Sequence, residues 1–178
     1  MRQVTDRMLR AAMLDATVYE EVEADTSATW QAVGVVVLSS LCAGIGSGAE
    51  GGIGGIIVWT LVALIGWYVW AYLMYVIGTR ILSEAQTESN PGELLRTIGF
   101  SSAPGVLRVV GVIPGLRTIV FVVVSIWMLV AMVVAVRQAL DYTSTVRAIG
   151  VCSLGYLIVL LLILLFASPL ASIAFSSG

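Results

Sequence analysis

The chain has 178 residues, of which 59% are hydrophobic and only 11% are charged. Its nine basic residues are all arginine, its eleven acidic residues leave a net charge of −2, and it has no lysine and no histidine. Soluble domains are about one quarter charged, and a chain of this length cannot hide so many apolar residues in one small core. The composition therefore excludes an ordinary water-soluble domain and predicts an integral membrane protein.

The N-terminal segment, residues 1–27, is polar enough to remain outside the bilayer. It does not have the basic start followed at once by an apolar stretch that marks a secretory signal. Between Val4 and Val22 apolar residues recur three to four positions apart, which predicts one amphipathic helix. We expect its apolar face, with Met8, Ala12 and Tyr19 as contact residues, to lie along the membrane surface or to dock on a partner.

Five apolar segments follow, and together they predict an all-α transmembrane domain over residues 28–167 with a short tail at 168–178. About 20 apolar residues cross the ~30 Å hydrocarbon core, and helices satisfy their own backbone groups there. A glycine-rich turn that carries Glu50 separates the first two segments. The predicted spans are Ala28–Gly46, Ile53–Thr79, Ile98–Ile113, Thr118–Val136 and Ala148–Ala167.

The third segment is the short one, and it contains both Pro104 and the charge of Arg108. Extended back to Glu93, it becomes long enough to cross as a fifth helix. The alternative is a re-entrant or broken helix, which lipid tolerates only where protein shields it.

Arginines beside the spans predict the orientation, because cytoplasmic loops carry the excess of positive charge. Seven arginines lie on the side of the N-terminus and two on the other side, whether the chain crosses five times or four. We therefore predict an inner-membrane protein with a cytoplasmic N-terminus. Five crossings place the C-terminus on the opposite side.

Reactive side chains are scarce. The absence of histidine removes zinc-protease motifs and Ser–His pairs, the absence of lysine removes Schiff-base chemistry, and no predicted span contains a carboxylate. The glycine runs at 44–48 and 51–55 follow no predicted strand, so they do not indicate a nucleotide-binding loop. We expect no catalytic residue, no metal, no cofactor and no nucleic-acid partner.

Arg108 is the only charge inside an apolar segment. A charge in this position is a candidate for binding an anionic lipid head group or a partner carboxylate, with Glu50 as the acid to test. The competing interpretation is that its long side chain extends to the nearby membrane surface.

Tyr68, Tyr72 and Tyr75 share one face of the second span by their spacing. They are weak candidates for a wall against a flat hydrophobic cofactor. The competing interpretation is an interfacial belt with ordinary helix packing.

The stretch from Glu93 to Pro104 ends in a Gly-aromatic-small-small-Ala-Pro run, and with three later features it resembles the Yip1 family of small multi-pass membrane proteins. The later features are Trp127, the Arg137–Leu140 run, and Ser144 with Arg147 and Ala148. The likeness covers roughly residues 5–167. It implies a five-helix bundle with a cytoplasmic N-terminus. Eukaryotic relatives bind small GTPases through a long cytosolic arm, but the motif of that arm does not occur here, so GTPase binding is not expected.

We therefore expect a non-enzymatic protein that acts by helix–helix contact as an accessory, assembly or scaffold subunit of a larger membrane complex. Its expected partners are the lipid bilayer and other membrane subunits or further copies of itself; small residues spaced four apart favour such close helix contact. The alternative is a small channel or a lipid or solute passage. In that case Arg108 and the Pro104-interrupted segment form the selective element.

Overall fold

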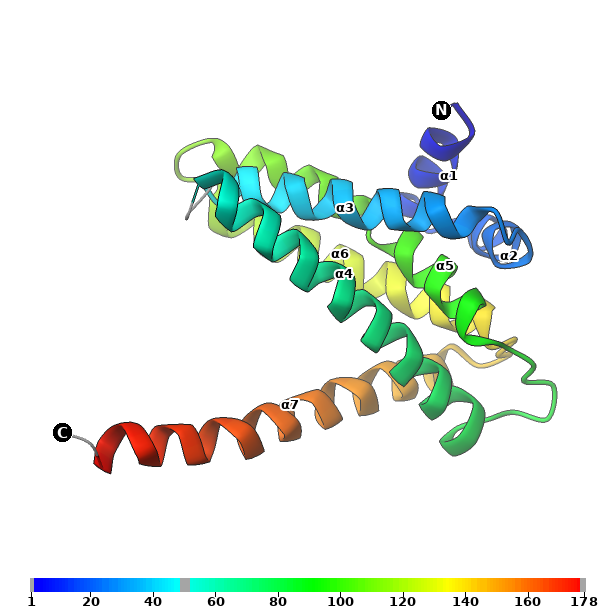
Figure 1. Cartoon of the computed structure of the whole chain (residues 1–178). Coiled ribbons are helices and arrows are strands. Elements are labelled where there is room, and N and C mark those ends of the chain that lie inside the picture. The colour runs from blue at the N-terminus through cyan, green and yellow to red at the C-terminus, as the bar shows by residue number, and fades with distance from the viewer. Residues whose placement is uncertain (1, 49–51, 177–178) are drawn as a thin grey trace.

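The described part of the protein is entirely helical, as Figure 1 shows for the computed structural model. The structure describes residues 2–48 and 52–176, with side chains up to residue 165, so Glu50 lies outside the described residues. In chain order the elements are α1 (Arg2–Ala12), α2 (Ala16–Ala24), α3 (Ala28–Gly46), α4 (Gly52–Val76), the π-helical turn η1 (Ile77–Ile81), α5 (Pro91–Ser101), the 3₁₀ helix η2 (Ala103–Val112), α6 (Arg117–Ala139) and α7 (Thr145–Ser176).

The N-terminal segment forms two helices, α1 and α2, where the sequence pattern predicted one. The chain turns at Leu14, whose φ is +63°, and the Asp15 side chain then accepts a hydrogen bond from the Thr17 amide at 3.0 Å. Aspartate in this role ends one helix and begins another, because it offers the backbone a local partner outside the helical ladder. The turn allows both helices to pack against the rest of the chain.

Within the described residues, four helices are long and apolar enough to cross a membrane: α3, α4 with η1, α6, and α7 up to Leu165. They correspond to four of the five predicted spans. The helical backbone of α7 continues to Ser176, so the predicted tail at 168–178 is helical over most of its length.

The third predicted span is broken rather than continuous. α5 begins at Pro91 under a capping box in which Asn90 and Glu93 exchange hydrogen bonds, and it ends at Ser101. Pro104 has no N–H to continue the α-helical ladder, and the chain continues as the tighter helix η2. At about 2 Å per residue, the ten residues of η2 extend roughly 20 Å. The segment is therefore a broken helix, interrupted between Ser101 and Ala103, and its crossing of the membrane stays a prediction.

α5 and η2 together lie alongside α3 and run in the same direction. A Cβ added to Gly99 of α5 would lie 2.7 Å from the Cβ of Ala32, in the second turn of α3. At the far end, a Cβ added to Gly46 would overlap the carbonyl oxygen of Arg108 in η2. The broken pair therefore follows α3 over most of its length, in backbone contact at its end.

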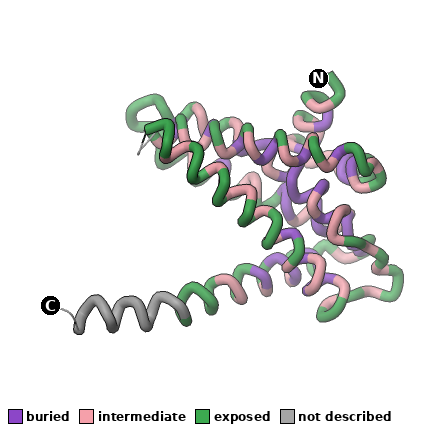
Figure 2. The backbone as a smooth tube through the Cα atoms, viewed as in Figure 1, coloured by how far each residue is buried: buried purple, intermediate pink, exposed green. Residues whose placement is uncertain are grey.

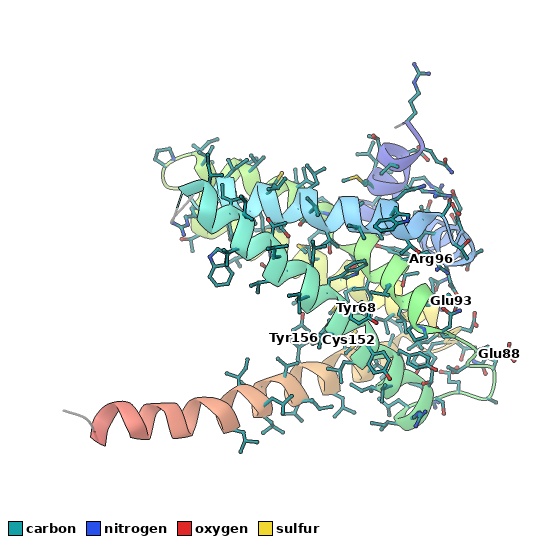
Figure 3. All side chains as sticks on the ribbon, viewed as in Figure 1. Tyr68, Glu88, Glu93, Arg96, Cys152 and Tyr156 are labelled. Atoms are coloured by element: carbon teal, nitrogen blue, oxygen red, sulfur yellow. The ribbon has the colours of Figure 1, made fainter. Side chains whose placement is uncertain are left out.

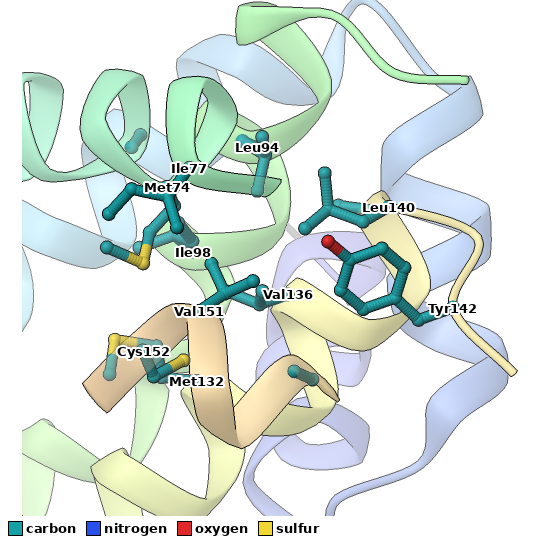
Figure 4. Close-up of a cluster of buried hydrophobic side chains, with 13 residues drawn as sticks. Met74, Ile77, Leu94, Ile98, Met132, Val136, Leu140, Tyr142, Val151 and Cys152 are labelled. Carbon is teal, nitrogen blue, oxygen red and sulfur yellow. The ribbon is translucent and has the colours of Figure 1, made fainter. Parts of the chain in front are cut away.

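Two apolar clusters hold the helices together at the end of the bundle where α3 begins, and Figure 2 shows buried residues concentrated there. One joins the end of α4 to α5, α6 and the start of α7, around Met74, Leu94, Val136 and Val151 (Figure 4). The other places α1 and α2 against α3, α5 and α6.

The opposite half of the bundle is loosely covered by this chain alone. Only Ala71 and Met74 of α4 are buried. α7 diverges from the other helices (Figure 1), and its side chains from Leu160 to Leu165 are about half exposed. Such a surface is costly in water and ordinary in lipid, so this arrangement suits a membrane-embedded chain.

Candidate functional site

A cleft of about 1050 Å³ lies between α3, α4, α6, the α5–η2 segment and the first turns of α7. Its lining combines three tryptophans with seven serines and one arginine. A pocket with an apolar wall and a few convergent polar groups is the usual form of a ligand site. It is the most developed site among the described residues.

One face of α4 forms the apolar wall of the cleft. Trp59, Trp67 and Trp70 line it, with the small residues Ala63 and Gly66 between them. These five positions fall on one side of a helix with 3.6 residues per turn. A Cβ added to Gly66 would meet nothing within 4 Å, so the glycine leaves open space in the wall.

The deeper indole groups are held in place by neighbouring helices. Trp67 donates its Nε1–H to the Leu95 carbonyl at 3.1 Å, and Trp70 donates to the Met132 sulfur at 3.0 Å. Trp70 also packs against the Tyr156 ring of α7, with centroids 4.6 Å apart. Figure 3 shows Tyr156 and Cys152 together at the start of α7, facing α4.

Among the described lining residues of the cleft, Arg108 alone is charged. Its Nη2 donates to the Ser125 hydroxyl at 2.9 Å, and its guanidinium carbon lies 5.5 Å from the centroid of the Phe121 ring. Both partners belong to α6, so the side chain turns inward instead of extending past the end of η2. Its Nε is buried and has no hydrogen-bond partner among the described residues.

The electrostatics of this end of the cleft favour an anion. None of the described carboxylates pairs with Arg108, and the nearby polar groups are hydroxyls, which carry no charge. A guanidinium with an unused donor in an apolar setting is a strong binding group for phosphate or carboxylate. Glu50, the predicted acidic partner, lies outside the described residues.

The predicted tyrosine face lies elsewhere. Tyr68 and Tyr72 are 59% and 53% exposed and do not line the cleft, while Tyr75 packs against the buried cluster. The Tyr72 and Tyr75 ring centroids are 6.1 Å apart. Helical periodicity puts Tyr68 and Tyr72 on the side of α4 opposite Gly66.

The aromatic face predicted as a wall was the tyrosine face, whereas the tryptophan face lines the cleft. The available signal was the placement of small residues, Ala63 and Gly66, between large aromatic ones on one helical face. Spacing alone does not say which of two aromatic faces meets the other helices.

The N-terminal contact residues pack on their own chain. Tyr19 is fully buried, and its hydroxyl donates to the Ala11 carbonyl at 3.1 Å. Met8 and Ala12 are half-buried against the cluster formed with α3, α5 and α6. Trp127 of α6 donates to the Ala12 carbonyl at 2.8 Å. Tyr19 is therefore buried inside its own chain, whereas contact of Met8 and Ala12 with a membrane surface or a partner stays a prediction.

Arg7 fastens α1 to α2 and to the start of α3. Only 3% of its surface is exposed. Its Nη2 lies 2.8 Å from a Glu21 carboxylate oxygen, and its Nη1 donates to Asp25 at 2.9 Å and to Gln31 at 3.0 Å. A buried arginine with several charge-assisted bonds gives this corner a defined geometry.

A second buried arginine, Arg96 of α5, binds backbone carbonyls at the end of α2 (Figure 3). Its Nε donates to the Val22 carbonyl at 2.9 Å, and it also donates to the Glu23 carbonyl. Burial raises the pKa of the Glu23 carboxyl to about 7, and the negative charges of Glu93 and Asp141 add to the effect. A carboxyl group whose pKa is near 7 therefore lies at the junction of α2 and α5.

The described part of the chain has few other reactive or metal-ligating side chains. It contains no group of three or more metal-ligating side chains. Cys42 and Cys152 are free thiols in buried positions.

Comparison with known families identifies the domain. The model of the Yip1 domain matches residues 16–167, which confirms the resemblance seen in the sequence. Of the residues that carried this resemblance, Arg147 donates to the Ser83 carbonyl at 2.9 Å and lies 3.4 Å from a Glu84 carboxylate oxygen. No curated protein and no solved structure matches the chain.

Proposed function

This chain belongs to the Yip1 family, and we propose that it acts by helix–helix contact as an accessory, assembly or scaffold subunit of a larger membrane complex. Its Yip1 domain and long apolar helices make it a membrane protein. The lack of histidine and lysine, with no carboxylate inside a span, supports a non-enzymatic role.

The proposed topology has five crossings, with α5 and η2 as the third. It is supported by their parallel path along α3, from Gly99 at Ala32 to Arg108 at Gly46. It is supported as well by contacts that bring the loop after η1, the end of α6 with the following loop, and α2 together at one end. Tyr142 donates to the Leu82 carbonyl at 2.8 Å, and Gln138 donates to Glu20 of α2 at 2.7 Å.

The distribution of arginines supports a cytoplasmic position for that end, in the inner membrane. The contacts of Arg7, Arg96 and Arg147 lie there, whereas Arg108 and Arg117 lie toward the other end. Positive charge accumulates on the cytoplasmic side. With five crossings, the C-terminus then lies on the opposite side.

The observation that carries the contact role is the outward face of α4. Ile57, Leu61, Ile65, Tyr68 and Tyr72 lie on it by helical periodicity, and each is more than half exposed. Two of them, Tyr68 and Tyr72, belong to the tyrosine face. A stripe of branched aliphatic and aromatic side chains along one side of a spanning helix presents the packing surface that a second helix needs. Met8 and Ala12, which keep part of their surface exposed, extend the proposed contact to α1.

Site-specific photo-crosslinking tests this role. A photoreactive amino acid at Leu61 on the outward face is expected to yield a discrete protein adduct in intact membranes. The same amino acid at Ala63, two residues further along α4 and on its cleft side, is the matched control and is expected to yield none. Adducts of equal yield at both positions, or lipid adducts alone at Leu61, would contradict the proposal.

The cleft favours a second candidate function, the passage of a lipid or solute. Arg108, close to the helix break at Pro104, is its selective element. The Arg108 guanidinium and the backbone at the break both border the open space of the cleft. The purified chain in liposomes should then carry a flux that Arg108→Ala abolishes. A helix-contact protein should carry none and should tolerate that substitution.

A further inference from the structure

We propose that the cleft binds one anionic phospholipid, with its phosphate on Arg108 and an acyl chain along the tryptophan wall of α4. This site goes beyond the contact role, because it depends only on the chain lying in a bilayer. It follows from the polarity, the direction and the openness of the cleft.

The polar end of the cleft is organised for a single anion. Arg108 uses Nη2 on Ser125, while its buried Nε has no partner among the described residues. Ser40 and Ser47 line the cleft as well, but their hydroxyls donate to the Val36 and Gly44 carbonyls of their own helix. These hydroxyl groups are uncharged, so they do not balance the positive charge of the Arg108 guanidinium. A phosphate oxygen at Nε would supply both the missing hydrogen bond and the missing charge.

Large apolar side chains form most of the wall in the rest of the cleft, with serines between them. Trp67, Trp70, Met128, Met132 and Ile149 line it away from Arg108. Its volume of about 1050 Å³ exceeds what a lone phosphate occupies, and is at the upper end of the range for small-molecule sites. A free inorganic anion would leave this wall without a partner, whereas an acyl chain would cover it.

The direction of the cleft matches that of a lipid. Arg108 lies beside Gly46, at the end of α3 and one turn from the end of η2. Met132 and Cys152 lie toward the opposite end, inside the buried cluster. The charged group therefore lies near a membrane surface, and the apolar wall extends from it toward the bilayer interior, which is the arrangement of a phospholipid in its leaflet.

The cleft is also accessible from the side. Its lining residues Trp59, Ile149 and Tyr156 are 68%, 48% and 48% exposed, and α7 diverges from α4 beyond them (Figure 1). A lipid can therefore enter by lateral diffusion. No described carboxylate balances Arg108, and a second helix placed here would balance it only if it carried an acid at the same depth, so the phospholipid is the better match.

Native mass spectrometry of the full chain in a neutral detergent tests the site. Phosphatidylglycerol, as the anionic probe, is expected to bind as a single saturable adduct. Phosphatidylcholine is expected to bind at least about tenfold more weakly, since a net anionic head group makes the stronger charge-assisted bond. Arg108→Gln should weaken phosphatidylglycerol binding by at least about tenfold, and Arg108→Lys by less.

A second variant tests the apolar end and leaves Arg108 intact. Gly66→Phe fills the open space in the wall and is expected to weaken the adduct at least about tenfold, because it displaces the acyl chain. Gly54→Phe is the matched control in the same helix: a Cβ there also meets nothing within 4 Å, and the residue does not line the cleft. It should bind as the wild type does.

Three results would overturn the proposal: equal binding of the two lipids, an adduct that survives both Arg108→Gln and Gly66→Phe, or tight binding of inorganic phosphate alone. The last result would identify a site for small anions. Equal thermal stability of Gly66→Phe and Gly54→Phe shows that a lost adduct reflects the site and not the fold. The crosslinking result at Leu61 is independent, since that side chain faces away from the cleft.

Discussion

The carbonyl oxygen of Arg108 occupies the space that a Cβ on Gly46 would need. The two residues join the last turn of α3 to η2. Gly111, which also belongs to η2, approaches the Gly46 carbonyl as well. Because the contact is between backbones, neither side can relax by a change of rotamer. It sets the position of Arg108 and therefore of the polar end of the cleft.

Gly46→Ala is expected to destabilise the protein by at least about 2 kcal/mol, since the added methyl must displace the η2 backbone. Thermal unfolding in detergent measures the effect. Gly34→Ala is the matched control in α3: its Cβ would meet nothing within 4 Å, and the substitution should be neutral or stabilise by up to about 1 kcal/mol. Equal stability of the two variants would disprove the backbone contact.

Arg7→Met is expected to loosen α1. It keeps much of the apolar stem but removes the bonds to Glu21, Asp25 and Gln31, at a cost on the order of 2 kcal/mol. Hydrogen exchange of the α1 amides should accelerate roughly thirtyfold. Arg2→Met, at an exposed position of the same helix, should leave exchange unchanged. Unchanged exchange in the Arg7 variant would show that α1 is held by apolar packing alone.

Trp127→Phe removes the hydrogen bond from α6 to the Ala12 carbonyl and keeps an aromatic ring in place. The expected loss is about 0.5–1.5 kcal/mol, visible as faster exchange at the end of α1 and a lower melting temperature. Trp30→Phe, at a side chain that is 81% exposed, is the control and should have no such effect.

Glu23 should make stability depend on pH. Its pKa in the folded protein is about 7, above the ordinary value of 4.5, so the folded state binds more protons than the unfolded state between these values. The contribution of Glu23 to the free energy of unfolding should therefore be complete below pH 4.5 and be lost as the pH rises through 7, by on the order of 2 kcal/mol.

Glu23→Gln should abolish this decline and raise the melting temperature at pH 8. Melting curves at pH 5 and pH 8 measure the difference, with the exposed Glu88→Gln as the control. A wild-type protein that gains stability from pH 5 to pH 8 would contradict the assignment.

The five-crossing topology predicts opposite labelling of two engineered cysteines. Glu88→Cys, in the exposed loop before α5, should react with a membrane-impermeant maleimide only in inside-out vesicles. Ile113→Cys, at the end of η2 and 48% exposed, should react only in intact cells whose outer membrane has been permeabilised. The native thiols, Cys42 and Cys152, are buried and provide the background. Labelling of both positions from one side would show that α5 and η2 do not cross.

By itself, the sequence determined the membrane character, the helical class and the approximate limits of α3, α4, α6 and α7. These properties are local: a long apolar segment without charges must be helical in lipid, whatever its neighbours are. The uneven distribution of arginines is likewise readable without a fold. Arg108 was recognisable as a site candidate for the same reason, since a charge within an apolar segment needs an explanation in any arrangement.

Only the tertiary structure decided which faces meet. The tryptophan and tyrosine faces of α4 have similar composition, and the packing of α4 against α3, α5 and α7 turned Trp67 and Trp70 inward and left Tyr68 and Tyr72 outside. Likewise, the turn at Leu14 folded Tyr19 into its own bundle. The reason is physical: in a mostly apolar chain, hydrophobicity does not distinguish a lipid-facing side from a protein-facing side, so shape and the few hydrogen bonds choose between them.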